Sequence, residues 1–338
     1  MTRPSRKPVI GLVMGDAAGI APELIIKAFE NEALTSTCSP FVIGNTSIMK
    51  LAASTMGRRL DFCPLKSVAD IQPHATAIPI LEGGIDNPNF KWGVVDSING
   101  RNAVSYIEKG VDLGMRKEID GMVIAPLNKE SMHKGGMQFP DEIAFLGHLV
   151  KTRVRTVIKW GKVFRSTVVG HVRFSKIAEM VTKSNIVPVI DNLNNVIRQF
   201  GIDSPRIAVA ALNPHGGEDG TFGDEEIREI APAVESVKAT GVQVSGPFPA
   251  DTVFVRAIKG QFDGVVFLYH DQGNIAMKSA AFGEGVLIYT GVPFPCASVV
   301  HGCAYGKAGQ NRADSTSFED TVMTIAQMAV RQMDGGND

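Results

Sequence analysis

The segment VVFLYHDQG, residues 265–273, joins a run of apolar and aromatic residues to a histidine and an aspartate. The run does not alternate between polar and apolar residues, which predicts a strand buried on both faces, as in a parallel sheet. Other short runs rich in Val and Ile repeat this character along the chain. The candidate strands are Val9–Val13, Phe41–Ile43, Ala77–Leu81, Gly121–Ala125, Thr167–Val169, Ile207–Ala211, Val265–Tyr269 and Val286–Tyr289.

Helical patterns lie between these runs, with apolar residues at helical spacing and a proline, Pro22, that suits a first helical turn. The candidate helices are Pro22–Phe29, Asn102–Lys117, Ser175–Val181, Asp224–Thr240 and Ser317–Met333. Strands that alternate with helices predict an α/β fold. Because 338 residues exceed one ordinary core, we expect a sheet that runs through two lobes.

The charge balance and the cysteines limit the class of protein. The chain has 34 basic and 35 acidic side chains, which does not favour binding to nucleic acid or to an anionic membrane. No apolar stretch approaches the roughly 20 residues of a membrane-spanning helix. The four cysteines are scattered without a CxxC motif. We therefore expect a reduced, cytoplasmic protein that acts on a small molecule.

Three histidines follow strand-like runs: His171, His215 and His270. Because the carboxyl ends of parallel strands share one edge of a sheet, these side chains are candidates for one site. Three imidazoles with an open position suit a catalytic divalent ion, with Zn²⁺ first and Mg²⁺, Mn²⁺ or Co²⁺ as alternatives. Taken singly, each histidine fits a hydrogen-bonded loop residue better than a metal ligand. Asp271 is placed to orient the neighbouring His270.

Seven segments resemble the 4-hydroxythreonine-4-phosphate dehydrogenase family of vitamin B6 synthesis, whose fold is related to isocitrate and isopropylmalate dehydrogenases. They occur in the family's order and span most of the chain. The segments are GDAAGIAPE (15–23), SINGRNAV (97–104), IAPLNKE (124–130), NPHGGEDGTFGDEE (213–226), GPFPADTVF (246–254), YHDQGNIAMK (269–278) and HGCAYGKAG (301–309).

The resemblance implies a two-lobed α/β fold with a sheet shared between lobes and a central cleft. The first lobe would be residues 1–130 plus 299–338, with the cofactor loops. The second would be residues 131–298, with the metal ligands and the interface of a homodimer. The metal would lie between subunits, with His171 and His215 from one and His270 from the other.

The substrate pocket implied by the resemblance is altered in this sequence. A His-Thr pair of the family's phosphate site becomes Glu142 and Ile143, an Asn becomes Leu287, and an Arg becomes Cys296, while Lys278 is kept. Loss of several charge-assisted hydrogen bonds, each about 1.5–3 kcal/mol, argues against a phosphate monoester. Glu142 or its neighbour Asp141 would instead accept hydrogen bonds from substrate hydroxyls, or both would be solvated acids.

The cofactor loop implied by the resemblance is HGCAYGKAGQNRA, residues 301–313. His301, Gly302 and Ala304 open this loop. Gly306 stands where related dehydrogenases carry an Asp that suits the ribose hydroxyl of NAD, and Lys307 and Arg312 lie nearby. Replacement of a carboxylate by nearby cations favours binding of the 2′-phosphate of NADP. If Lys307 instead points into solvent, NAD is the expected cofactor.

These residues predict a metal-dependent NAD(P) dehydrogenase. It would oxidise a secondary hydroxyl near a carboxylate, with or without decarboxylation, on a sugar acid or a cis-dihydrodiol carboxylate. Lys278 would anchor the substrate or protonate the product, and Asp271 and Asp251 would orient ligands. The alternatives are the vitamin B6 reaction itself and, from another class, a binding protein without catalysis.

Overall fold

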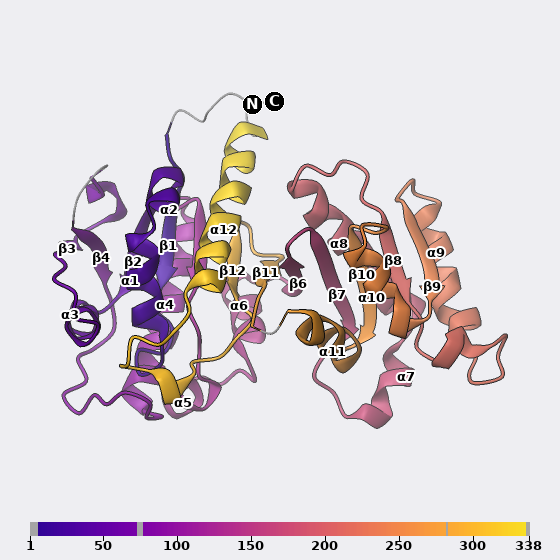
Figure 1. The fold of residues 1–338 in the computed structure, drawn as a ribbon, viewed down its shortest axis with the longest axis horizontal. Helices are drawn as coiled ribbons and strands as arrows, with labels where there is room; N and C mark the ends of the chain where they lie inside the picture. Colours follow the sequence, from indigo (N-terminus) through magenta and orange to yellow (C-terminus); the bar gives the residue numbers. More distant parts are fainter. Residues whose placement is uncertain (1–5, 73–76, 282, 336–338) are drawn as a thin grey trace. The chain divides into compact units, whose positions relative to one another are not determined.

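The computed structural model describes residues 6–72, 77–281 and 283–335. The chain forms two compact units, Met1–Arg155 with Val286–Asp338 (unit 1) and Thr156–Gly285 (unit 2). Both are α/β, as predicted, and Figure 1 shows the elements along the chain. The longest helices of the described part are not apolar enough to cross a membrane.

Unit 1 is built on strands in the order β3-β4-β2-β1-β5-β12-β11. The pairs are parallel except β11 with β12, which is antiparallel. The strands are β1 (Val9–Val13), β2 (Ser39–Gly44), β3 (Phe62–Leu65), β4 (Ile78–Glu82), β5 (Gly121–Ile124), β11 (Val286–Thr290) and β12 (Cys296–Val299).

Helices cover both faces of this sheet, which explains why its strands are continuously apolar. On one face Gly110 of α4 lies against Met122, and on the other Ile325 of α12 lies against Gly121. The helices of unit 1 are α1 (Ala21–Glu30), α2 (Glu32–Thr37), α3 (Thr46–Thr55), α4 (Ser97–Met115), α5 (Lys129–Lys134), α6 (Glu142–Val150) and α12 (Thr316–Gly335).

Unit 2 has strands in the order β6-β7-β10-β8-β9, parallel except β6 with β7. The strands are β6 (Arg155–Trp160), β7 (Val163–Val169), β8 (Ile207–Ala210), β9 (Val244–Phe248) and β10 (Gly264–Tyr269). Phe254 of α10 and Met277 of α11 join the core on one face. The helices are α7 (Ile177–Met180), α8 (Lys183–Gln199), α9 (Ala231–Lys238), α10 (Ala250–Ile258) and α11 (His270–Ala280).

The compact units differ from the lobes expected from the sequence, which divided the chain at 130/131 and 298/299. Residues 131–155 and 286–298 belong to unit 1. Strand pairing explains residues 286–298, because β12 forms parallel hydrogen bonds with β5 and β11 pairs with β12. Helix packing explains residues 131–155, because α6 packs on α4. The expected sheet shared between the lobes and the expected central cleft would involve both units, and they stay predictions.

Candidate functional site

His171 and His270 lie together in unit 2. They follow β7 and β10, which are adjacent parallel strands with Val169 opposite Tyr269. The two imidazole ring centroids are 4.9 Å apart. Neighbouring strands of one chain deliver both rings, and the expected division of the ligands between subunits stays a prediction.

His270 is oriented by the next residue. Its Nδ1 lies 2.7 Å from Oδ1 of Asp271, and both side chains are partly exposed. A carboxylate that holds Nδ1 leaves Nε2 as the ring nitrogen that can bind a metal. The contact with His270 is the one expected for Asp271, and its role at a metal stays a prediction.

His215 lies on a separate turn, Pro214–Gly217, after β8. Its φ of 54° places a non-glycine residue in the left-handed region. The turn is held by the buried Glu226, whose Oε1 accepts hydrogen bonds from the backbone N–H groups of Leu212 and Asn213, each at 2.8 Å. The local strain is thus supported by a buried carboxylate.

The donor set fits a divalent ion only in part within one chain. Imidazole nitrogens are suitable ligands for Zn²⁺, and two of the three are adjacent. Within residues 6–72, 77–281 and 283–335, however, no three His, Cys, Asp or Glu side chains gather closely enough to hold a metal. The third ligand is therefore not assembled with the other two in a single chain.

Lys278 and Asp251 are both exposed in unit 2. Lys278 lies on α11, two helical turns after His270, and Asp251 lies in the first turn of α10. Residues four apart on a helix share a face, so His270 and Lys278 lie along one side of α11.

The altered substrate positions lie in unit 1. Glu142 begins α6, and its Oε1 accepts a weak hydrogen bond from the buried Tyr289 hydroxyl at 3.5 Å. Asp141 is not simply a solvated acid, because its Oδ1 caps α6 by accepting from the Ala144 N–H at 2.9 Å. Tyr289 was missed by the sequence argument; burial raises its pKa well above the usual value, and the Glu142 charge adds to this.

Cys296 and Leu287 take no part in charge recognition. The Cys296 side chain is fully buried on β12, where burial raises the pKa of its thiol. Leu287 on β11 stands opposite Ser298, and Ile143 is half-buried on α6. These side chains make this part of unit 1 apolar. Glu142 is the substrate-position residue there that carries a negative charge.

The loop of residues 301–313 is anchored by the GDAAGIAPE segment. The Tyr305 hydroxyl donates to Oδ2 of the buried Asp16 at 2.8 Å and lies 3.1 Å from Ser131 Oγ. The Ile20 N–H donates to the Cys303 carbonyl at 3.0 Å. Burial raises the pKa of Asp16, while hydrogen bonds from Tyr305, Ala18 N–H and Ser131 oppose the rise.

Further contacts hold the far end of the same loop. The Asn311 N–H donates to Oε1 of buried Glu23 at 3.2 Å, and the Lys27 ammonium donates to the Ala313 carbonyl. Gly309 packs on the Trp92 ring, which a Cβ would approach to 2.6 Å. The GDAAGIAPE turn near the N-terminus, for which the sequence predicted no separate role, thus docks the loop.

The predicted cofactor residues lie on the open side of this loop. Gly302, Ala304, Gly306, Lys307 and Arg312 are exposed, and His301 is half-buried with Nδ1 3.1 Å from the Gly302 carbonyl. Hydrogen bonds from Thr316 chiefly lower the pKa of Asp314, and the charge of Lys307 contributes a little. Lys307 therefore lies near a carboxylate as well as near solvent.

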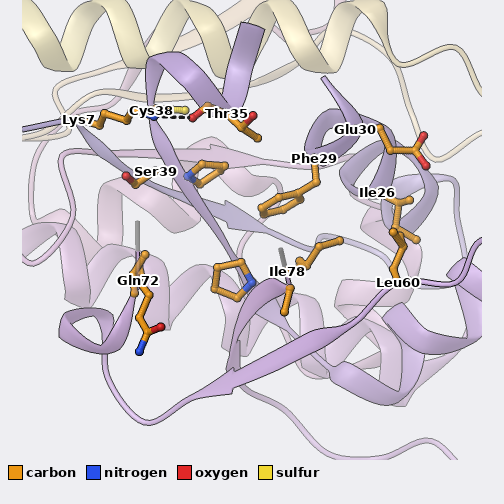
Figure 2. Close-up of a pocket in the computed structure, with 14 residues that line it drawn as sticks. Lys7, Ile26, Phe29, Glu30, Thr35, Cys38, Ser39, Leu60, Gln72 and Ile78 are labelled. Carbon is orange, nitrogen blue, oxygen red and sulfur yellow. Dashed lines mark hydrogen bonds between the residues drawn. The ribbon is translucent and has the colours of Figure 1, made fainter. Parts of the chain in front are cut away.

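A separate cavity of about 280 Å³ lies in unit 1, between α1, β2 and β4 (Figure 2). Its wall includes Phe29, Ile26 and Ile78, and its charged groups are engaged at the rim. Lys7 donates to the Thr35 carbonyl at 3.0 Å, and Glu30 accepts from Arg58 at 2.6 Å. We assign no chemistry to this cavity, because none of the candidate site residues lines it.

Comparison with known proteins adds to this geometry. The family model described as pyridoxal phosphate biosynthetic protein PdxA matches residues 36–325. A D-threonate 4-phosphate dehydrogenase from Cupriavidus necator is 35% identical over 327 residues, which cover 96% of this chain and 98% of the relative. The crystal structure of a 4-hydroxythreonine-4-phosphate dehydrogenase from Klebsiella pneumoniae is 33% identical, with a TM-score of 0.85 and coverage of 96% and 98%.

A more distant structure shares the fold alone. The terephthalate 1,2-cis-dihydrodiol dehydrogenase from Burkholderia xenovorans is 21% identical, with a TM-score of 0.65 and coverage of 95% and 98%. Together the matches define an NAD(P)-dependent oxidoreductase that acts on a CH–OH group. The chain belongs to the PdxA family of dehydrogenases.

Proposed function

We propose that this PdxA-family enzyme oxidises a secondary hydroxyl next to a carboxylate, with a divalent ion bound by His171, His215 and His270. The observation that carries the proposal is the pair of imidazole rings 4.9 Å apart at the ends of β7 and β10. Zn²⁺ suits this donor set best. Such an ion, when bound, would lower the pKa of the substrate hydroxyl and stabilise the alkoxide.

The chain's own residues have separate roles in this proposal. Asp271 fixes the His270 ring through Nδ1, and Asp251 supplies a second orienting carboxylate. Lys278, on the same side of α11 as His270, anchors the substrate anion or protonates the carbon that loses CO₂ if decarboxylation follows. A homodimer would supply the third imidazole, because one chain assembles only two of them.

For the substrate, the altered positions support an unphosphorylated hydroxy acid. Glu142 repels a phosphate dianion, and Leu287 and the buried Cys296 offer it no charge. The second candidate is a phosphorylated hydroxy acid, because the relatives named above are 4-phosphate dehydrogenases.

A direct assay separates these two substrates. We expect NAD(P)H to form faster with sugar acids or cis-dihydrodiol carboxylates than with 4-hydroxythreonine 4-phosphate or D-threonate 4-phosphate. Turnover of the phosphorylated compounds alone would establish the second candidate. Loss of activity on chelation and its return with Zn²⁺ would support the metal, whereas full activity after chelation would contradict it.

For the cofactor, the positive charge of Lys307 beside Gly306 favours the 2′-phosphate of NADP, and the exposure of this side chain to solvent keeps NAD as the second candidate. A charge-assisted hydrogen bond to the 2′-phosphate is worth about 1.5–3 kcal/mol, so Lys307→Ser should lower kcat/KM for NADP by about tenfold or more. The value for NAD should change little. Equal effects on both cofactors would remove Lys307 from phosphate recognition.

A further inference from the structure

Arg165 is a buried cation in unit 2. It lies on β7 with 5% of its surface exposed, and its guanidinium fits between β7 and α11. Burial lowers its pKa to about 10, which still leaves the group protonated at neutral pH. Nothing in the sequence singled it out, because an arginine inside a strand forms no motif.

The partners of Arg165 in the described part of unit 2 are neutral. Nε donates to Met277 Sδ at 3.4 Å, one terminal nitrogen donates to Thr167 Oγ1 at 3.3 Å, and the other donates to Asn274 Oδ1. A buried ion without an opposite charge is strongly unfavourable, so such groups are normally paired. Guanidinium carries five N–H donors, so two remain for another acceptor.

The helix above the guanidinium leaves room for it. A Cβ at Gly273 of α11 would lie 3.1 Å from a terminal nitrogen of Arg165 and 2.8 Å from the Phe267 ring. Glycine at this position therefore lets the cation approach the helix backbone closely.

The same helix connects Arg165 to the candidate site. His270, Asn274 and Lys278 are spaced four residues apart on α11, so they follow one side of the helix. Asn274, the middle residue, accepts from Arg165. The buried cation thus lies beneath the side of α11 that carries a proposed metal ligand and a proposed substrate anchor.

We propose that Arg165 completes an anion subsite in unit 2, which binds a carboxylate or phosphate group of the substrate at the two N–H donors of the guanidinium that its neutral partners leave free. The bound anion supplies the counter-charge that the neighbouring side chains lack, and its oxygens accept the two remaining N–H donors. This extends the proposed function by giving the substrate's anionic group a specific partner, although anion binding itself does not depend on turnover.

The test measures anion binding without nucleotide, substrate or metal. Inorganic phosphate and acetate are titrated separately into chelator-treated protein by calorimetry, for wild type, Arg165→Met and Arg206→Met. The control removes an equal charge in unit 2, but Arg206 is exposed and already paired with Asp263 at 2.8 Å. We expect Arg165→Met to weaken binding of at least one anion by about tenfold or more, and Arg206→Met to bind like wild type.

A second variant decides the matter if Arg165→Met does not fold. Gly273→Ala keeps the charge but fills the space beside it, so it should also weaken anion binding. Unchanged anion affinity in Arg165→Met or in Gly273→Ala, or equal losses in Arg206→Met, would overturn the subsite. The anion whose affinity falls more identifies the group as phosphate or carboxylate.

Failure of this inference differs from failure of the proposed function. Anion binding that depends on Arg165, without dehydrogenation of any substrate offered, would keep the subsite and reject the proposed reaction. If the enzyme dehydrogenates a substrate but its anion affinity is unchanged in Arg165→Met, the proposed reaction is kept and the subsite is rejected.

Discussion

At the scale of single residues, the contact between His270 and Asp271 has a measurable consequence. A carboxylate that orients a metal-binding histidine typically contributes about 10–100-fold to metal affinity. We therefore expect Asp271→Asn to weaken Zn²⁺ binding by that order, measured by competition with a chelating dye. Glu235→Gln is the control, because it removes a carboxylate from an exposed ion pair with Lys238. Equal affinities in Asp271→Asn and wild type would show that the contact has no role at a metal.

Asp16 makes a second prediction at this scale, through pH. Its pKa is raised in the folded protein, chiefly by burial, so the folded state holds the proton more tightly than the unfolded state. Its contribution to stability is therefore present at low pH, below the unfolded value of about 3.9, and is lost as pH rises through the folded pKa. Relative to wild type, Asp16→Asn should gain stability as pH rises from about 4 to 7.

Asp314 is the matched control for Asp16, because its shift has the opposite sign. Hydrogen bonds from Thr316 lower its pKa, so its contribution is present above the unfolded value and is lost as the pH falls. In urea midpoints, Asp314→Asn should therefore gain stability relative to wild type as the pH falls from about 5 to 3, and should follow wild type from about pH 5 to 7, where Asp16→Asn gains. Parallel changes would contradict the environments described for these two carboxyl groups.

At the scale of elements, the docking of the 301–313 loop on the start of α1 is held by close backbone approach. A Cβ on Gly19 would lie 2.7 Å from the Cys303 Cβ and 2.8 Å from its carbonyl oxygen. Gly19→Ala must therefore push the loop away, and we expect weaker NAD(P) binding by about tenfold with a smaller effect on kcat. A dissociation constant equal to that of wild type would mean that the docked position is not needed for the cofactor.

The strands that the sequence predicted are those buried on both faces. β1, β5 and β10 were found within one residue of their observed bounds, because an uninterrupted apolar run has few other structural explanations. β3, β6, β9 and β12 were missed. Pro64 and Gly246-Pro247 interrupt the patterns of β3 and β9, and the four-residue β12 is too short to stand out although it is fully buried. The helix expected at Asp224–Thr240 instead starts with a π-helical turn, η4 (Glu226–Ile230), where Glu226 turns inward to hold the His215 loop.

The site was predicted less completely than the fold. His270 and Asp271 are neighbours in sequence, so their contact could be expected. Tyr305 and Asp16 are 289 residues apart, and nothing local in either segment indicates the other. Arg165 was missed for the same reason, since its partners Asn274 and Met277 come from another element.

At the scale of the whole molecule, the proposed metal site, for which one chain brings together only two of the three histidines, predicts complementation between chains. His215→Ala and His270→Ala should each be inactive as homodimers. If each site draws ligands from two subunits, random mixing gives about half heterodimers, each with one intact site, and about a quarter of wild-type activity. The recovered activity is measured by refolding the two variants together and comparing the mixture with each variant refolded alone. No recovery on mixing would place all three ligands in one chain.

The indole of Trp92 lies against Gly309, so this side chain is an intrinsic reporter of the docked loop. Trp160 is the second tryptophan of the chain, and within unit 2 its indole N–H donates to Glu284. In a Trp160→Phe background, tryptophan emission would come from Trp92 alone. Displacement of Gly309 would expose that ring to water and shift its spectrum to the red, so loop detachment can be followed in real time without a label.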